Sequence, residues 1–374
     1  MTSKRAEKQR IIPVFLPAVS CPGHCVFCDQ KAISGIQSVP SPEKVAEIVG
    51  KGIDCAGLNG SSLREIHKLP GNIEVAFYGG SFTSAPRDLQ ESWVRAARQV
   101  IPEVPVRVSA RPDRLGAEER AMLKKLAVQT VEVGCQSMDD SVLTLSGRGH
   151  DSAAIVNAVR GLLDESFTVG VQMMTGLPGQ SMASAIETGK KLSDLNPHFA
   201  RIYPVLVLSG TALEKMWKSG DYEPPTLDET VDTVARIFSI FRRRDIPVIR
   251  MGLHGETEFT ESSVLAGPFH QSFGELVYSR IFGGAILKFI QSRQLTSGDL
   301  SVKVHETSFS RACGFRKSNR ILLGHREFNL LVQTDNEIGP WEMVISFSRN
   351  HPNGGTTDFS LEKTSCKINV HEFN

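Results

Sequence analysis

Cys21-Pro-Gly-His-Cys25-Val-Phe-Cys28 is the stretch around which the rest of this 374-residue sequence is organised. Its three thiols lie within eight residues, and a loop this short can direct all three sulfur atoms at one centre. Thiolates are the ligands that hold iron–sulfur clusters, and three of them leave one iron of a 4Fe-4S cube open to another ligand. The stretch therefore predicts a 4Fe-4S cluster bound by Cys21, Cys25 and Cys28.

Zinc is the main alternative for these thiols, because Cys21, His24, Cys25 and Cys28 could supply four ligands. Structural zinc sites usually combine two separated pairs of ligands, however, and the sequence holds no second C-x2-C pair. A disulfide is disfavoured by the expected compartment. The basic residues 1–10 are not followed by a long apolar segment, so we expect no signal peptide, no membrane span and a cytoplasmic protein with reduced thiols.

Apolar strand-like runs alternate with helical patterns along the first 250 residues or so. The expected strands are Ile11–Leu16, Ile73–Tyr78, Val104–Ser109, Thr130–Gly134, Val169–Met174, Phe199–Leu208 and Pro247–Leu253. Such alternation predicts an α/β fold, a partial or complete (β/α) barrel of parallel strands. A doubly wound open sheet is the alternative, but it would concentrate its ligand contacts at one switch point. Here unusual residues follow nearly every strand.

Residues 1–265 are predicted to form this barrel, and residues 266–374 a small C-terminal α+β extension that caps it. Within the extension we expect a helix at Ala285–Ile290 and short strands at Val302–His305 and Ile321–Leu323, with the last 25 residues as a hairpin or loose tail. Eight Lys and Arg residues lie between Lys288 and Arg326, opposed by Asp299, Glu306 and the adjoining Glu327. This basic stretch, 288–326, is either a solvated surface or a contact for RNA phosphates.

The cysteine spacing, with Phe27 before the third cysteine, resembles that of the radical S-adenosylmethionine (radical SAM) family. The resemblance implies that S-adenosylmethionine binds the open iron through its amine and carboxylate, and that one electron cleaves it to a 5'-deoxyadenosyl radical. It further implies that the strand end at Gly79, Gly80 and Ser81 holds the methionine amine. A tight turn alone would also account for the two glycines.

Other residues of the cofactor site are implied by the same resemblance. Gln136 and Glu132 match positions near the ribose in relatives of oxygen-independent coproporphyrinogen oxidase, although Glu132 could instead be paired within the barrel. Arg148 matches an arginine that meets the cofactor carboxylate, although a solvent-facing role fits equally. Gly176, in the segment Gly176-Leu-Pro-Gly-Gln180, would pass beside the adenine.

Several longer segments are similar to the Elongator catalytic subunit and its bacterial and archaeal relatives, over residues 10–280 or so. They are Arg111–Asp113, Val131–Gly134, Gln136–Asp140, Tyr203–Leu213, Trp217–Tyr222 and Val248–Arg250. That subunit modifies the wobble uridine of tRNA and carries an acetyltransferase domain. This chain departs from it in its shorter cysteine spacing and in lacking an acyl-CoA loop motif after the barrel, so carboxymethylation of uridine does not carry over.

The predicted function is therefore a radical SAM enzyme acting on RNA, most naturally tRNA, with a flavodoxin or ferredoxin as electron donor. His270 is a weak candidate for substrate contact. Two alternatives stay open: a radical or haem-handling enzyme with a small-molecule substrate, and a non-catalytic protein that only binds the cluster. Binding of tRNA that weakens steeply with salt would favour the RNA-acting enzyme over the enzyme with a small-molecule substrate.

Overall fold

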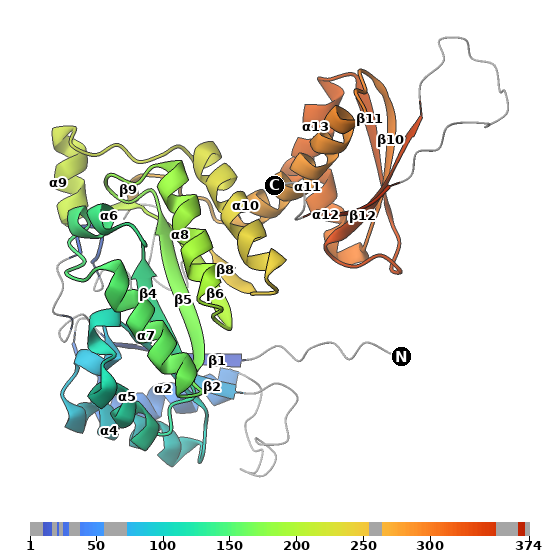
Figure 1. Cartoon of the computed structure of the whole chain (residues 1–374). Coiled ribbons are helices and arrows are strands. Elements are labelled where there is room, and N and C mark those ends of the chain that lie inside the picture. The colour runs from blue at the N-terminus through green and yellow to red at the C-terminus, as the bar shows by residue number, and fades with distance from the viewer. Residues whose placement is uncertain are drawn as a thin grey trace, which may run out of the picture.

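The computed structural model describes residues 10–16, 21, 25–29, 38–55, 73–253, 264–348 and 366–370. Predictions that fall on His24, Thr257–Ser263 or Asn353–Gly355 lie outside these residues. No helix in the described ranges is long and apolar enough to cross a membrane. Figure 1 shows two parts: a curled sheet covered by helices, and a smaller helix-and-sheet unit carrying the C-terminal end of the described chain.

Seven parallel strands form the larger sheet, and their order in space is the order in the chain. They are β1 (Arg10–Leu16), β2 (Ile73–Gly79), β3 (Val106–Ala110), β4 (Thr130–Gln136), β5 (Thr168–Thr175), β6 (Phe199–Pro204) and β8 (Val248–Met251). Among the described strands β1 and β8 do not pair with each other, so the sheet is a half-barrel open at its two edges. The predicted parallel barrel is confirmed in its partial form.

Helices follow the strands, and most of them cover the outer side of the sheet (Figure 1). The covering helices are α2 (Pro42–Cys55), α4 (Arg87–Val100), α5 (Ala117–Lys125), α7 (Ser152–Asp164), α8 (Met182–Asp194) and α10 (Leu227–Arg243). The short helices α6 (Asp140–Leu145) and α9 (Ala212–Ser219) lie at one end of the sheet. The start of α10 is fixed by a capping box, in which Thr226 Oγ1 accepts from the Glu229 N–H and the Glu229 carboxylate accepts from the Thr226 N–H. Such caps explain why the helices begin where polar residues precede apolar ones.

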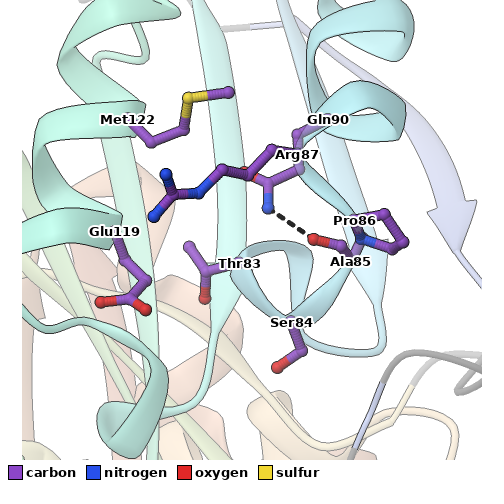
Figure 2. Close-up of a pocket in the computed structure, with 8 residues that line it drawn as sticks. All are labelled: Thr83, Ser84, Ala85, Pro86, Arg87, Gln90, Glu119 and Met122. Carbon is purple, nitrogen blue, oxygen red and sulfur yellow. Dashed lines mark hydrogen bonds between the residues drawn. The ribbon is translucent and has the colours of Figure 1, made fainter.

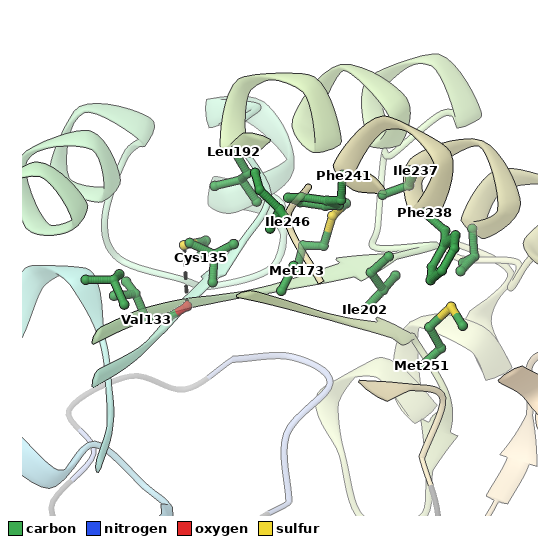
Figure 3. Packing of buried hydrophobic residues seen from close by; sticks show 14 of the residues in the cluster. Val133, Cys135, Met173, Leu192, Ile202, Ile237, Phe238, Phe241, Ile246 and Met251 are labelled. Carbon is green, nitrogen blue, oxygen red and sulfur yellow. Dashed lines mark hydrogen bonds between the residues drawn. The ribbon is translucent and has the colours of Figure 1, made fainter. Parts of the chain in front are cut away.

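Alternate residues of each strand face the helices, because side chains alternate across a strand. Figure 3 shows Val133 and Cys135 of β4, Met173 of β5 and Ile202 of β6 packed against α8 and α10. The residues between them point into the barrel. They include Glu74, Tyr78, Arg107, Glu132, Arg201 and Tyr203. The helix-facing side is therefore apolar, whereas the barrel interior is charged.

The C-terminal part packs on the barrel through α11 (Phe273–Ser292), which lies against α10. Its sheet has the order β11-β10-β12-β13, with β10 and β11 parallel. These strands are β10 (Gly298–Val304), β11 (Phe328–Thr334), β12 (Glu342–Ser348) and β13 (Cys366–Asn369), and the short helices are α12 (Phe309–Cys313) and α13 (Ser318–Gly324). One apolar cluster runs from the barrel helices into this sheet, so the boundary at 265/266 stays a prediction.

The expectation of a strand at Ile321–Leu323 is wrong, because these residues belong to α13. Leu323 is buried, whereas Ile321 and Leu322 are exposed. This apolar run therefore does not correspond to a buried strand. The expected helix at Ala285–Ile290 is the second half of α11, which is much longer. The expected strand Phe199–Leu208 is divided into β6 and a separate β7 (Val207–Leu208), which pairs with β9 (Val264–Ala266).

Candidate active site

The carboxyl ends of the parallel strands meet at one edge of the half-barrel, and the segments that follow them carry the predicted site residues. The cysteine stretch follows β1, the glycine pair ends β2, Arg111 follows β3 and Gln136 ends β4. Gly176 follows β5 directly. Residues separated by more than a hundred positions therefore lie at the same edge, which we call the barrel mouth.

The thiols of Cys21, Cys25 and Cys28 are half-buried at this mouth. The Cys28 N–H donates to the Cys25 carbonyl at 3.1 Å, which closes a tight turn between the second and third cysteines. The Val26 N–H donates to the Ser146 carbonyl at 3.1 Å, and the Val26 carbonyl accepts from the Leu213 N–H at 2.7 Å. The stretch is thus fastened to the segment after α6 and to the start of α9.

Phe27 packs on the apolar cluster beside the mouth rather than pointing into solvent. Together with Val26 it contacts a set of buried residues that includes Val205, Val207 and Leu213. The aromatic residue before the third cysteine therefore anchors the loop in this structure. Its assignment to the cofactor site stays a prediction.

Two buried arginines approach the middle cysteine. Arg148 Nη1 lies 3.3 Å from Cys25 Sγ, and Arg111 Nη1 lies 3.9 Å from the same atom. Arg111 also donates to both carboxylate oxygens of Asp113 and to the Arg148 carbonyl. Burial works to lower the pKa of Arg111, but Asp113 and the sulfur atoms of Cys25 and Cys21 outweigh it, so the pKa is raised. The Arg111 guanidinium therefore stays charged and favours anions at this position.

Arg148 is held on its other side by neutral partners. Its Nη2 donates to the Gly134 carbonyl at 2.5 Å, and its Nε donates to His150 Nε2 at 3.2 Å. Burial and the charge of Arg148 lower the pKa of His150 to about 4. The imidazole is therefore neutral near pH 7 and acts as the acceptor. Arg148 is 5% exposed, so its solvent-facing alternative is wrong.

The glycine pair ties the first three strand ends together. Gly79 has φ 108°, and a Cβ there would lie 2.1 Å from the Leu16 carbonyl oxygen, so only glycine fits. The Gly80 N–H donates to that same carbonyl at 3.1 Å. Ser81 is buried, and its Oγ accepts from the Arg111 N–H at 3.1 Å. The assignment of these residues to the methionine amine stays a prediction.

Gln136 ends β4 in a left-handed conformation with φ 67°, at a bulge in the pairing of β4 with β5. Its side chain is buried, and its Oε1 has no hydrogen-bond partner among the described residues. Buried amide oxygens are normally paired, so this one is available to a donor from a ligand. A Cβ on the neighbouring Gly134 would lie 3.2 Å from Gln136 Nε2, and glycine leaves this space open.

Glu132 lies deeper in the barrel, and its carboxylate is already surrounded. Arg107 Nη1 donates to it at 2.7 Å, Arg201 Nη2 at 2.9 Å and Tyr78 Oη at 3.1 Å. Arg107 also donates to Glu74 at 2.8 Å. Burial and the Glu132 charge raise the pKa of Tyr78, which keeps its hydroxyl protonated as a donor. The pairing within the barrel is the arrangement observed, and a ribose contact stays a prediction.

Gly176 begins the turn after β5 with φ 83°. Its carbonyl accepts from Tyr222 Oη at 2.6 Å, and its N–H donates to Gln180 Oε1 at 2.9 Å. A Cβ there would lie 2.8 Å from the Pro225 side chain, so a larger residue would displace the segment before α10. The turn is rigid, and its predicted place beside an adenine is untested.

Four further residues at or below the mouth were not predicted as site residues: Arg111, His150, Arg107 and Arg201. Arg111 stands in the segment Ala110-Arg111-Pro112-Asp113, and its place directly after a predicted strand could have indicated a site residue. Arg107 and Arg201 each lie between apolar residues of a strand, where a charge indicates an inward-pointing side chain with a buried partner.

A separate pocket of about 280 Å³ lies in the segment that follows Ser81, beside the first turn of α4 and the face of α5 (Figure 2). It is lined by Thr83, Ser84, Ala85, Pro86, Arg87, Gln90, Glu119 and Met122. Gln90 Nε2 donates to the Ala85 carbonyl at 2.7 Å across one wall. None of the predicted site residues lines this pocket. In the described part of the chain no group of three His, Cys, Asp or Glu side chains is placed to hold a single metal ion.

Comparison with known proteins identifies two adjoining family models. The radical SAM superfamily model matches residues 15–192, and the radical SAM C-terminal domain model matches residues 197–282. An uncharacterized protein of Methanocaldococcus jannaschii is 31% identical over 241 residues, which cover 60% of this chain and 70% of that protein. A tRNA uridine(34) acetyltransferase of Methanocaldococcus infernus is 25% identical over 312 residues, 72% of this chain and 55% of that enzyme.

Elongator complex protein 3 of Saccharomyces cerevisiae is 27% identical over 218 residues, covering 50% of this chain and 39% of that protein. The chain thus spans about half the length, or less, of the relatives whose names state an activity. The solved structure of archaeal Elp3 from M. infernus superposes with a TM-score of 0.56 at 18% identity, covering 91% of this chain and 74% of that one. This likeness supports the fold.

Proposed function

Because the chain belongs to the radical SAM superfamily, we propose that it reductively cleaves S-adenosylmethionine at a 4Fe-4S cluster and acts on RNA, most naturally tRNA. The observation that carries the proposal is the three-thiol stretch at the mouth of a parallel half-barrel, with two buried guanidiniums against its middle cysteine. Three half-buried thiols at one edge, with buried guanidiniums against the middle one, bring sulfur ligands and compensating positive charge together, which suits a cluster held by thiolates.

Cys21, Cys25 and Cys28 would hold the cluster through their thiolates. When bound, the cluster supplies the electron that cleaves the C–S bond of S-adenosylmethionine to give the 5'-deoxyadenosyl radical. Arg148 and Arg111 offset the negative charge of the thiolates and of a carboxylate brought to the mouth. His150 keeps Arg148 oriented without adding a second charge, because its imidazole is neutral.

Gln136 and the glycine pair would orient the nucleoside cofactor. The buried Gln136 Oε1 accepts a hydrogen bond from a ribose hydroxyl, which satisfies an atom that has no other described partner. Gly79 and Gly80 expose backbone at the end of β2, so a ligand amine can approach carbonyl and hydroxyl oxygens closely. Phe27 and the apolar residues on which it packs keep water from one side of the cysteine loop.

RNA is proposed as the substrate for two reasons. Relatives that match most of this chain are named for modification of uridine 34 of tRNA. The basic stretch 288–326 lies in the C-terminal part, which packs on the barrel through α11. A flavodoxin or ferredoxin is the proposed electron donor. Acetyl or carboxymethyl transfer is not part of the proposal.

The test is formation of 5'-deoxyadenosine by anaerobically reconstituted protein with dithionite and S-adenosylmethionine, with and without unfractionated tRNA. We expect formation that increases when tRNA is added. If tRNA does not change the amount of 5'-deoxyadenosine formed, the radical chemistry is supported and the substrate is a small molecule instead of RNA. No formation at full iron and sulfide content would overturn the enzymatic proposal and leave a cluster-binding protein.

A further inference from the structure

The segment Gly314-Phe315-Arg316-Lys317-Ser318, here called the basic turn, joins α12 to α13 in an uncommon backbone conformation. Arg316 has φ 52° and ψ 35°, and Lys317 has φ 64° and ψ 24°. Residues with a Cβ other than Asn and Asp rarely adopt this left-handed region, and two in succession need outside support. Backbone held in such a conformation is concentrated at functional sites.

Buried contacts with α11 provide that support. The Phe315 N–H donates to Ser279 Oγ at 2.8 Å, and Asn319 Nδ2 donates to the Ser279 carbonyl at 3.0 Å and to the Ala312 carbonyl at 3.2 Å. A Cβ on Gly314 would lie 2.4 Å from the Asn319 backbone nitrogen, so the turn closes only with glycine there. The basic turn is therefore fixed before any partner arrives.

The two charges on the turn are exposed and unneutralised. Neither Arg316 nor Lys317 forms an ion pair with any residue that the structure describes. The Arg316 guanidinium lies 5.5 Å from the centre of the Phe315 ring, which steadies it without cancelling its charge. Other arginines nearby are used internally: Arg311 stacks on Tyr278, and Arg280 pairs with Asp228 and Asp232.

The basic turn also lies within reach of the barrel mouth. A Cβ on Gly267 would lie 3.0 Å from the Val205 carbonyl oxygen, directly after β6. His270 is three residues further on, and its ring meets the Phe315 ring edge-on at 5.3 Å. Since three residues extend at most about 11 Å, the turn lies at most on the order of 20 Å from the end of β6. Val26 and Phe27 of the cysteine stretch pack on the cluster that contains Val205.

We infer that the basic turn contacts the phosphate backbone of the RNA whose target nucleotide lies at the mouth. The inference rests on the proposed function and names the residues that would dock its substrate. A regular array of phosphates is complementary to fixed, adjacent, unpaired cations, and a turn that is already ordered loses little conformational freedom on binding. Phosphate contacts of this kind position a nucleic acid without reading its sequence.

The experiment measures binding of unfractionated tRNA to the full-length, cluster-loaded protein across a salt series. Arg316→Asn and Lys317→Asn remove each charge while keeping a residue that tolerates the left-handed region. Lys191→Ala is the matched control, because Lys191 is exposed on α8, outside the basic stretch 288–326. Arg316→Lys retains the charge. Melting temperature and cluster absorbance report whether each variant is folded.

We expect the double Asn variant to bind on the order of tenfold more weakly, with a salt slope lower by about one unit for each charge removed. Arg316→Lys and Lys191→Ala should bind like the wild type. If the double variant binds as tightly as Lys191→Ala, the inference about the turn is wrong while the RNA proposal stands. If the wild-type protein itself binds no tRNA, both are overturned, and 5'-deoxyadenosine formation then decides whether the radical chemistry survives.

Discussion

Two pairs of buried arginines differ in how their charges are balanced. In the barrel interior Arg107 and Arg201 face Glu74 and Glu132, so two cations meet two anions in a hydrogen-bonded set. At the mouth Arg111 pairs with the carboxylate of Asp113, whereas Arg148 contacts the Cys25 thiol, the Gly134 carbonyl and the neutral His150 imidazole. The balanced charges of the interior stabilise the fold. The excess of positive charge among the described residues of the mouth is suited to an anionic ligand.

The largest effect is expected from replacing Cys25, the cysteine that both mouth arginines approach. Cys25→Ala should abolish both the cluster and 5'-deoxyadenosine formation, because the other two thiols cannot hold a cube stably. Iron and sulfide analysis with chromatography of the product measures this. Cys135→Ala is the control, since Cys135 faces the helices (Figure 3) and should retain cluster and activity. A full cluster in the Cys25 variant would mean that the mouth is not the cluster site.

A change among the charged residues of the barrel interior should lower the stability of the fold. Glu132→Gln leaves two buried guanidiniums short of a carboxylate, and breaking such a pair costs about 3–5 kcal/mol of unfolding free energy. The expected fall in melting temperature is on the order of 5–10 °C.

Glu118→Gln is the matched control for this change, because the pair of Glu118 with Arg87 is exposed and should contribute little. Scanning calorimetry on the apo proteins compares them. Equal melting temperatures for the two variants would show that the interior charges are not a structural set.

Replacing one arginine from each pair sharpens the contrast. Arg148→Met should weaken S-adenosylmethionine binding about tenfold to a hundredfold, as loss of a charge-assisted hydrogen bond predicts. Its melting temperature should stay close to wild type, because the change also relieves repulsion with Arg111. Arg201→Met should show the opposite pattern. Its melting temperature should fall because Glu132 loses a partner, and its S-adenosylmethionine binding should stay close to wild type. Equilibrium dialysis and thermal melts measure both, and identical behaviour of the two variants would remove the distinction.

The smallest expected effect is the pH response of the neutral histidine at the mouth. The pKa of His150 is lowered to about 4 by burial and Arg148, against about 6.5 in the unfolded chain. Above pH 6.5 neither state holds the proton. Between about pH 6.5 and 4 the unfolded chain binds it and the native protein does not, so stability falls as the pH decreases through this window. His150→Asn should flatten that part of a denaturant-midpoint profile, and an unchanged slope would contradict the assignment.

The sequence allowed the half-barrel to be predicted because each strand is apolar on the helix side and each strand end carries its own unusual residues. The cysteine stretch, the glycine pair and Gln136 stand at such strand ends, whereas Arg148 was named from the family resemblance alone, and the cofactor roles of all of them stay predictions. The partners of Arg107 could not be found, because Glu74 and Glu132 lie on the strands to either side of β3 and the register between strands is set by packing.

The C-terminal part was predicted less well for a related reason. Its strands β11 and β12 alternate buried and exposed residues, but the exposed positions include Leu331, which blurs the alternation. Short apolar runs such as Ile321–Leu323 fit helix and strand alike, and packing on α11 decides between them. The conformation of the basic turn depends on Ser279, some thirty-five residues earlier, so no local pattern indicates it.

The order of strands in the larger sheet, which follows the chain from β1 to β8, bears on how the protein forms during synthesis. Each strand can pair with its neighbour as soon as both have left the ribosome, and no strand must wait for a later one to be inserted between existing partners. Pairings between consecutive units are short in sequence for a parallel sheet, which favours folding that proceeds from the N-terminus. The cysteine stretch emerges directly after the first strand, but it is fastened to Ser146 and Leu213, so its final position must wait until α9 has been synthesised.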